Sequence, residues 1–305
     1  MFDGTQTTDA AFARYEAIRA RLPVANFPAF SHIAGNLSDV ADRYDAFVLD
    51  AFGVLNVGDT PISGAVARMA ALRAMGKKLV VLTNAASYTR ADALNKYRKL
   101  GFDFNADEVV SSRDVAVSRL GDLGPGKMAT GKTWAAISAG GDSFSDIPAK
   151  VIDLIDDNAW HADGFLFLSS ARWTPALQTR LHDALKSNPR PLIVANPDIV
   201  APREDGLTAE PGLFAHDLID ALGLQTQWFG KPFPDAYVEA KARLPGIPTQ
   251  RIAMVGDTLH TDVLGGAAAG MGTILITDHG LFRGHDVAPY IAASGIRPDV
   301  IIKTT

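Results

Sequence analysis

Short apolar runs of strand length alternate with stretches of helical periodicity, and this rhythm constrains the fold more than any other feature of the chain. The run DAFVLDA at 45–51 has an uninterrupted apolar centre at 46–49, as in strands that are buried on both faces of a parallel sheet. The same signals predict further strands at 78–83, 227–229, 251–255, 273–277 and 300–303, and helices at 64–75, 89–100, 234–244 and 262–269. We therefore predict an α/β fold with a doubly wound, Rossmann-like parallel sheet.

The segment between these two sets of elements is longer than one sheet requires. Residues 87–227 carry predicted strands of their own at 164–168 and 191–195. The sequence thus predicts a catalytic core built from residues 1–86 and 228–305, with an inserted α/β cap domain at 87–227. Ahead of the first strand, residues 10–22 predict a helix that packs on one face, because apolar side chains recur there at helical spacing: Phe12, Tyr15, Ile18 and Leu22.

Composition excludes several classes of function. The formal net charge is -5 and the pI is about 5.8, and the basic residues are scattered, which argues against nucleic acid or an anionic membrane as a partner. The chain has no cysteine, so disulfides and thiolate chemistry are excluded. No apolar run resembles a leader or reaches the roughly 18 residues of a membrane span, so we expect a cytoplasmic protein. The sequence leaves open whether it forms a homo-oligomer.

Residues with suitable chemistry stand at the ends of the predicted core strands. In open α/β sheets the ligand lies beyond the carboxyl ends of the strands. Asp50, Thr83 with Asn84, Lys231 and Asp257 occupy those positions. Phosphoryl transfer needs such a set, with a carboxylate nucleophile, donors and a cation for the phosphate oxygens, and hard oxygen ligands for Mg²⁺. The order of these residues indicates a small phosphorylated substrate.

Four of these segments carry a family resemblance. DAFGVL (50–55), VVLTNA (80–85), GKPFPDAY (230–237) and MVGDTLHTDVLGGAAAGM (254–271) resemble the ordered motifs of the haloacid dehalogenase superfamily. The spacing of Asp257, Thr261 and Asp262 is similar to that of its class IIA branch, which includes sugar-phosphate, nitrophenyl phosphate and pyridoxal phosphate phosphatases. That branch inserts a large α/β cap between the second and third motifs. The segment ANPDIVAPREDGL (195–207) resembles its cap signature.

The resemblance implies a set of metal ligands and a nucleophile. Asp50 would be the nucleophile and a ligand of Mg²⁺, with the main-chain carbonyl of Phe52 and the carboxylate of Asp257 as further ligands. Asp262 would orient metal-bound water and Lys231. On physical grounds alone, three crowded carboxylates repel one another, and a divalent cation with a lysine lets all of them stay ionised.

The resemblance also implies substrate contacts. Thr83 and the backbone amide of Asn84 would hold phosphate oxygens, and Lys231 would screen Asp50 from the incoming anion. In the predicted cap, Asn196, Asp198 and Arg172 are candidates for substrate contact, although structural roles in turns explain them equally well.

Phe52 departs from the family pattern. Family phosphatases carry an aspartate there, which donates a proton to the leaving oxygen and then activates water. A phenyl ring transfers no proton, and general acid-base assistance is typically worth about 10² to 10⁴ in rate. We consider His260 and His279 as replacements, against the simpler interpretation that both are solvated loop residues.

Three hypotheses follow from Phe52. The first is a magnesium-dependent phosphatase that works through an aspartyl phosphate. The second keeps the fold and cleaves a carbon–halogen or carbon–phosphorus bond, although a dehalogenase would not need the metal ligands. The third is a phosphometabolite-binding protein with impaired turnover.

Two further patterns have simpler explanations. Residues 126–133 (GKMATGKT) match the phosphate-binding P-loop by letter, but a helix end and a turn precede them in place of a buried strand. We interpret this run as a turn and a short strand. The acidic residues Asp153, Asp156 and Asp157 are interpreted as a solvated helix face.

Overall fold

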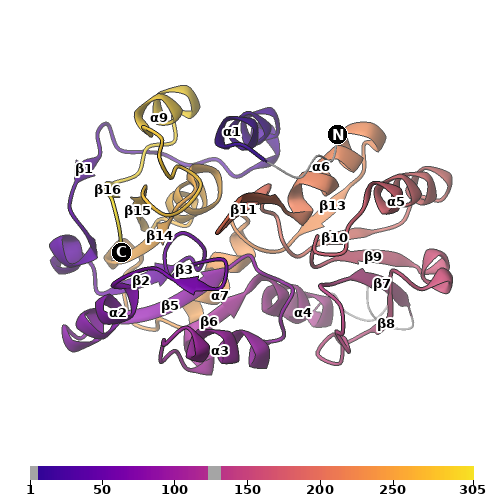
Figure 1. The fold of residues 1–305 in the computed structure, drawn as a ribbon, viewed down its shortest axis with the longest axis horizontal. Helices are drawn as coiled ribbons and strands as arrows, with labels where there is room; N and C mark the ends of the chain where they lie inside the picture. The colour runs from indigo at the N-terminus through magenta and orange to yellow at the C-terminus, as the bar shows by residue number, and fades with distance from the viewer. Residues whose placement is uncertain (1–5, 123–131) are drawn as a thin grey trace.

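The molecule has two halves, and each half is built around a parallel sheet (Figure 1). The computed structural model describes residues 6–122 and 132–305. The larger sheet, here the core sheet, has seven parallel strands in the spatial order β1 (His32–Ile33), β16 (Val300–Ile302), β15 (Gly272–Ile276), β14 (Ile252–Gly256), β2 (Ala46–Leu49), β5 (Lys78–Thr83) and β6 (Val109–Ser111). Strand β2 thus lies between β14 and β5, and the three strand ends predicted to carry chemistry are neighbours.

Helices cover both faces of the core sheet, which explains the uninterrupted apolar run of β2. Phe47 and Leu49 pack in one cluster with side chains of α2 (Ala65–Ala74) and α3 (Arg90–Lys99). Val48 points to the opposite cluster, which holds side chains of α4 (Ser112–Asp122) and α7 (Pro234–Ala242). Successive residues of a strand face opposite sides, so a strand covered on both sides has no polar position. The predicted Rossmann-like core is therefore present.

The second sheet, here the cap sheet, is also parallel. Its five strands lie in the order β13 (Thr226–Trp228), β10 (Leu192–Val194), β9 (Gly164–Phe167), β7 (Thr133–Ile137) and β8 (Lys150–Asp153). Helices α5 (Pro175–Ser187) and α6 (Pro211–Leu222) pack together beside it. Residues 126–131 of the P-loop-like run lie outside the described residues, and Thr133 begins a strand, where a P-loop would begin a helix.

Strand pairing differs from the predicted domain division in two places. Segment 87–122 was predicted as cap, yet its strand β6 pairs with β5 in the core sheet. The strand predicted at 227–229 was assigned to the core, yet β13 pairs with β10 in the cap sheet. Local periodicity identified the strand at 227–229 but carries no information about which of two parallel sheets it joins, and the three-residue strand β6 was not predicted at all.

Two hairpins reach the edge of the core sheet where its strands end. The first, β3 (Asn56–Val57) with β4 (Thr60–Pro61), follows Asp50 directly. The second, β11 (Val200–Arg203) with β12 (Gly206–Ala209), comes from the cap and lies between the two halves (Figure 1). It is called the cap hairpin below.

Helix α1 (Thr8–Ala17) contacts both halves of the molecule. Tyr15 and Ile18 are buried in a cluster with residues of the core helices α8 (Leu264–Ala268) and α9 (Ala288–Ser294). Toward the cap, the hydroxyl of Tyr15 accepts a hydrogen bond from the amide of Ile199 at 3.1 Å, and Arg14 pairs with Asp217 at 2.9 Å. The predicted helix at 10–22 is confirmed in type but ends earlier, followed by a short 3₁₀ turn at Arg19–Arg21.

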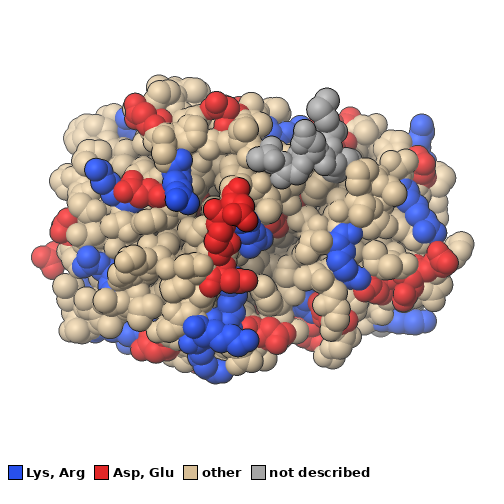
Figure 2. Space-filling view, in the orientation of Figure 1, with Lys and Arg blue, Asp and Glu red and all other residues tan. Residues whose placement is uncertain are grey.

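Charged side chains of both signs are mixed over the visible face, with a hollow near the middle (Figure 2). Within residues 6–122 and 132–305, no helix combines the length and the apolar character that crossing a bilayer requires.

Candidate active site

Three adjacent core strands place the predicted catalytic residues at one edge. Asp50 follows β2 directly, Thr83 is the last residue of β5, and Asp257 follows β14 directly. The amide of Asp50 donates to the carbonyl of Val255 at 2.8 Å, which fixes the two strand ends against each other. Asp50, Thr83 and Asp257 are all buried. Strand order therefore brings together residues that are more than 200 positions apart.

Three carboxylates meet around one lysine. One oxygen each of Asp50, Asp257 and Asp262 lies within 4.8 Å of the others. Lys231 Nζ lies 2.6 Å from Asp50 Oδ1 and donates a hydrogen bond to Asp262 Oδ1 at 2.7 Å. Lys231 is 1% exposed, so this ammonium is held inside the protein by its acidic neighbours. All four predicted residues are thus present in a single cluster.

The pKa values in this cluster reflect an excess of buried negative charge. Burial raises the pKa of Asp50 to about 7, with Lys231 opposing and Asp262 reinforcing the shift. Burial and the neighbouring Asp262 and Asp50 raise the pKa of Asp257 to about 8. For Lys231, burial alone would lower the pKa, but Asp262 and Asp50 outweigh it and raise the pKa. One lysine does not balance three carboxylates, and a divalent cation bound to their oxygens would. The donor set fits such a cation.

Short hydrogen bonds orient two of these carboxylates. The amide of Leu281 donates to Asp257 Oδ2 at 2.7 Å, and the hydroxyl of Thr258 donates to Oδ1 at 3.1 Å. Gly280 makes the first bond possible, because a Cβ there would lie 2.0 Å from Asp257 Oδ2. The amide of Thr258 donates to Asp262 Oδ2 at 3.1 Å. Sequence reasoning missed the loop at 280–281, since neither residue has a side chain with catalytic chemistry.

Asn84 joins the lysine loop to the cap. Its side-chain oxygen accepts from the amide of Lys231 at 2.7 Å, while its side-chain nitrogen donates to Asp198 Oδ1 at 2.8 Å. Thr83 Oγ1 accepts from the amide of Ala85 at 3.2 Å, so its own proton remains available for a ligand. The structure thus brings Thr83, Asn84 and Asp198 together beside Lys231.

A cavity of about 430 Å³, here the cap cavity, lies between the cap and this edge. Its lining includes Phe52 and Ala85, which stand two residues after Asp50 and Thr83. From the cap it includes Asn196, Asp198 and Arg203. Two of the three cap residues predicted to contact substrate, Asn196 and Asp198, therefore line this cavity, although Asn196 also donates a hydrogen bond to Glu210 at 3.0 Å.

The other cap candidate, Arg172, has a structural partner. It pairs with Asp153 at 2.8 Å and donates to the carbonyl of Ser138 at 2.9 Å. It does not line the cap cavity. Asp153 of the acidic cluster is thereby used in an ion pair within the cap.

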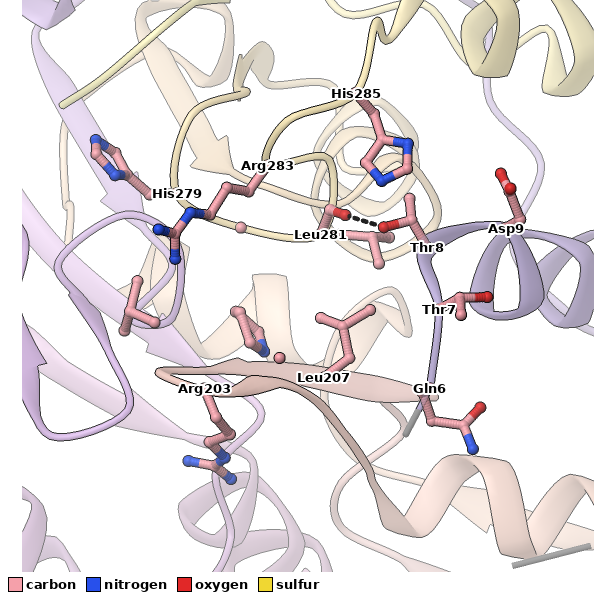
Figure 3. A pocket seen from close by; sticks show the side chains of 14 residues that line it. Gln6, Thr7, Thr8, Asp9, Arg203, Leu207, His279, Leu281, Arg283 and His285 are labelled. Atoms are coloured by element: carbon pink, nitrogen blue, oxygen red, sulfur yellow. Dashed lines mark hydrogen bonds between the residues drawn. The ribbon is translucent and has the colours of Figure 1, made fainter. Parts of the chain in front are cut away.

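The two histidines considered as substitutes for the missing acid lie elsewhere. His260 is fully buried against α1, where Nε2 lies 2.5 Å from Glu16 Oε1 and the ring stacks on Tyr15. His279 hydrogen-bonds Thr304 at 2.8 Å and faces a second cavity of about 460 Å³ on the opposite side of the cap hairpin (Figure 3). Neither lines the cap cavity, and each has a hydrogen-bond partner outside the cluster around Lys231.

Comparison with known proteins agrees with this geometry. Residues 47–139 match a family model described as haloacid dehalogenase-like hydrolase, and residues 228–304 match one described as HAD-hydrolase-like. An acid sugar phosphatase of Staphylococcus aureus strain USA300 is 26% identical over 232 residues, which covers 76% of this chain and 86% of that protein.

Solved structures share the whole architecture. A possible sugar phosphatase of the HAD superfamily from Cytophaga hutchinsonii superposes with a TM-score of 0.78 at 26% identity, covering 90% of this chain and 98% of that one. A glycerol phosphate phosphatase from Mycobacterium tuberculosis in complex with magnesium has a TM-score of 0.66 at 23% identity, covering 90% and 77%, and shows the fold alone. The chain belongs to the haloacid dehalogenase superfamily of hydrolases, in its class IIA branch.

Proposed function

We propose that the chain is a magnesium-dependent phosphatase that transfers the phosphoryl group of a small phosphorylated metabolite to Asp50. The observation that carries this proposal is the cluster of Asp50, Asp257 and Asp262 around Lys231 at the carboxyl edge of a parallel sheet. Its carboxylate oxygens are hard ligands of the kind that magnesium prefers. The relatives named as sugar phosphatases support a phosphate ester as the substrate.

The residues present account for two chemical steps. A carboxylate oxygen of Asp50 attacks phosphorus, and the bond to the leaving oxygen breaks with its electron pair. Water then attacks the aspartyl phosphate, which releases inorganic phosphate and restores Asp50. Lys231 holds Asp50 and Asp262 in register, and the free proton of the Thr83 hydroxyl binds a phosphoryl oxygen. A cation held by Asp50, Asp257 and the main-chain carbonyl of Phe52, with Asp262 orienting its bound water, would neutralise charge on the phosphoryl group.

The test is a screen of phosphate esters with and without Mg²⁺, combined with trapping of the covalent adduct. Rapid quench with labelled substrate should yield a hydroxylamine-sensitive adduct on Asp50 of the native protein, and Asp50→Asn should give neither adduct nor turnover. Asp45→Asn is the matched control, because Asp45 stands at the other end of the same strand and pairs with Arg251 on the surface. The Asp45→Asn variant should retain both the covalent adduct and turnover.

Other outcomes would change the assignment. An adduct on another residue would remove Asp50 from its role. Turnover of a halogenated acid without added metal would indicate carbon–halogen cleavage. Tight binding of phosphorylated compounds without turnover of any ester would indicate a phosphometabolite-binding protein.

A further inference from the structure

The ring of Phe52 lies between two cations. Lys96 Nζ is 4.9 Å from the ring centroid, and the guanidinium carbon of Arg203 is 4.7 Å from it. Both distances are in the range of favourable cation–π contacts. Lys96 comes from α3 of the core, whereas Arg203 ends the first strand of the cap hairpin. The position that carries a proton donor in family phosphatases is therefore occupied here by the ring of Phe52, and the side chains of Lys96 and Arg203 contact that ring.

Of the two cations, Arg203 is the one that faces substrate. It is the only lysine or arginine among the described residues that line the cap cavity, and Lys96 is absent from that lining. Alternation along β11 explains its direction, because Pro202 and Arg203 point to opposite faces of the hairpin. Arg203 also borders the second cavity, but Figure 3 shows its guanidinium on the far side of the hairpin from His279 and Arg283.

Arg203 is anchored along one edge of its guanidinium. Nε donates to Thr208 Oγ1 at 3.2 Å, and Nη2 donates to Glu210 Oε1 at 3.1 Å. Within the described residues these are the hydrogen bonds it makes, so Nη1 remains available for a ligand. Glu210 is itself buried and also receives hydrogen bonds from Thr208 and Asn196. The cation is therefore fixed in place before any substrate binds.

We propose that Arg203 is a catalytic residue that stabilises the departing oxygen as an anion, in place of the proton that Phe52 does not supply. The inference rests on the proposed phosphatase function. In an in-line displacement the leaving oxygen lies opposite the attacking carboxylate of Asp50. The cap cavity borders Phe52 and Ala85, two residues after Asp50 and Thr83, and Arg203 is the one lysine or arginine among the described residues that line it.

This role defines a class of substrate. As the bond from phosphorus to the leaving oxygen breaks, the electron pair stays on that oxygen, which leaves as an anion beside the guanidinium and takes a proton from water afterwards. A guanidinium stays charged and gives up no proton at neutral pH. Oxygens that are stable as anions depart readily, so the substrates are aryl, enol or acyl phosphates. Esters of simple sugar alcohols should be poor substrates.

The test is a plot of log kcat/KM against leaving-group pKa for a series of substituted phenyl phosphates in saturating Mg²⁺. Arg203→Gln should steepen the slope, with a loss of about 100-fold for the least acidic phenols and a smaller loss for nitrophenyl phosphate. Arg203→Lys should recover part of the difference because it restores the charge. Lys96→Met is the matched control, since it removes the other cation on Phe52 and should give a line parallel to the native one.

Each result bears on a separate claim. If Arg203→Gln is folded by circular dichroism and its line runs parallel to the native line, the inference is wrong while the phosphatase stands. Asp198 also lines the cap cavity and hydrogen-bonds Asn84. If the plot for Asp198→Asn is steeper than the native plot and the plot for Arg203→Gln is not, then Asp198 and not Arg203 assists the leaving oxygen. Absence of turnover for every ester by the native protein would instead remove the proposed function itself.

Discussion

At the scale of single residues, the phenyl ring at position 52 decides which esters the proposed phosphatase should cleave. Asp50, Asp257 and Asp262 surround Lys231 in one buried cluster. Phe52 packs against the core cluster between Lys96 and Arg203. In the proposed mechanism Asp50 attacks phosphorus, and Phe52 donates no proton to the leaving oxygen.

Phe52→Asp should therefore raise turnover selectively for poor leaving groups. A carboxyl group at that position can donate a proton, and such assistance is worth up to about 100-fold if it is well placed. Loss of the packed ring should lower the free energy of unfolding by about 3 kcal/mol. Circular dichroism must therefore accompany the kinetics. Comparison of aryl and alkyl phosphates measures the effect. Equal gains in turnover for aryl and alkyl phosphates would contradict the interpretation that position 52 is where the leaving oxygen lacks a proton donor.

Asp257→Asn should abolish metal-dependent activity and leave the fold intact. The amide removes a charged ligand of Mg²⁺, while its size preserves the packing around Leu281. In thermal unfolding, Mg²⁺ should raise the Tm of the native protein and leave that of the variant unchanged. Without metal, the variant should be at least as stable as the native protein because one buried repulsion is gone. Retained, metal-dependent turnover would rule out Asp257 as a ligand.

Much of the site was visible in the sequence, for a physical reason. Asp50, Thr83 and Asp257 each directly end or follow a buried strand, and parallel strands of one sheet have their carboxyl ends at one edge, so the meeting of these three residues was predictable. Arg203 could not be predicted as part of the site, because its position depends on how the cap hairpin packs over Phe52. The amide of Leu281 carries no signal at all, since any residue supplies an N–H.

At the scale of elements, helix α6 and the N-terminal segment meet through a buried histidine. His216 is 1% exposed, its ring stacks on Trp228 at 4.4 Å, and Arg21 Nη1 lies 3.2 Å from Nδ1. Burial and the neighbouring Arg21 and Arg14 lower the pKa of His216 to about 3, against a weaker opposing effect of Asp220. The folded protein therefore keeps this ring neutral under mildly acidic conditions.

This shift predicts a loss of stability in acid. The unfolded chain binds a proton at His216 below a pKa of about 6.5 and the folded chain does not, so the stabilisation is complete above that pH and declines toward pH 3. Between pH 7 and pH 5 the native protein should lose about 2 kcal/mol more than His216→Gln in urea unfolding. His161→Gln, at an exposed histidine, is the control and should follow the native protein. Identical losses of stability in all three proteins would exclude His216 as the cause of the acid destabilisation.

The boundaries between sheets illustrate what periodicity cannot provide. The strand at 227–229 was predicted, but β13 joins the cap sheet and not the core sheet. β6 was not predicted as a strand, and its segment was assigned to the cap although it joins the core sheet. Only the pairing of β6 with β5 and of β13 with β10, which depends on how the connecting helices pack, decides between the two sheets.

At the scale of the whole molecule, α1 packs against both the core and the cap. Its buried side chains share one cluster with core helices and with Ile199 and Val200 of the cap. Removal of residues 1–22 should lower the free energy of unfolding by several kcal/mol, at about 1.5 to 3 kcal/mol for each large apolar side chain lost. Urea unfolding measures this loss. A double substitution of Arg14 and Arg21 by Gln keeps the apolar contacts and should cost about 1 kcal/mol or less for each ion pair.

The ion pairs between the N-terminal segment and α6 have a consequence for how the protein responds to its medium. Arg14 of α1 and Arg21 of the following 3₁₀ turn reach Asp217 and Asp220, whose side chains are 52% and 42% exposed. Pairs this close to water weaken as dissolved salt accumulates. Rising ionic strength should therefore loosen this charged contact with the cap and leave the apolar cluster around Tyr15 in place.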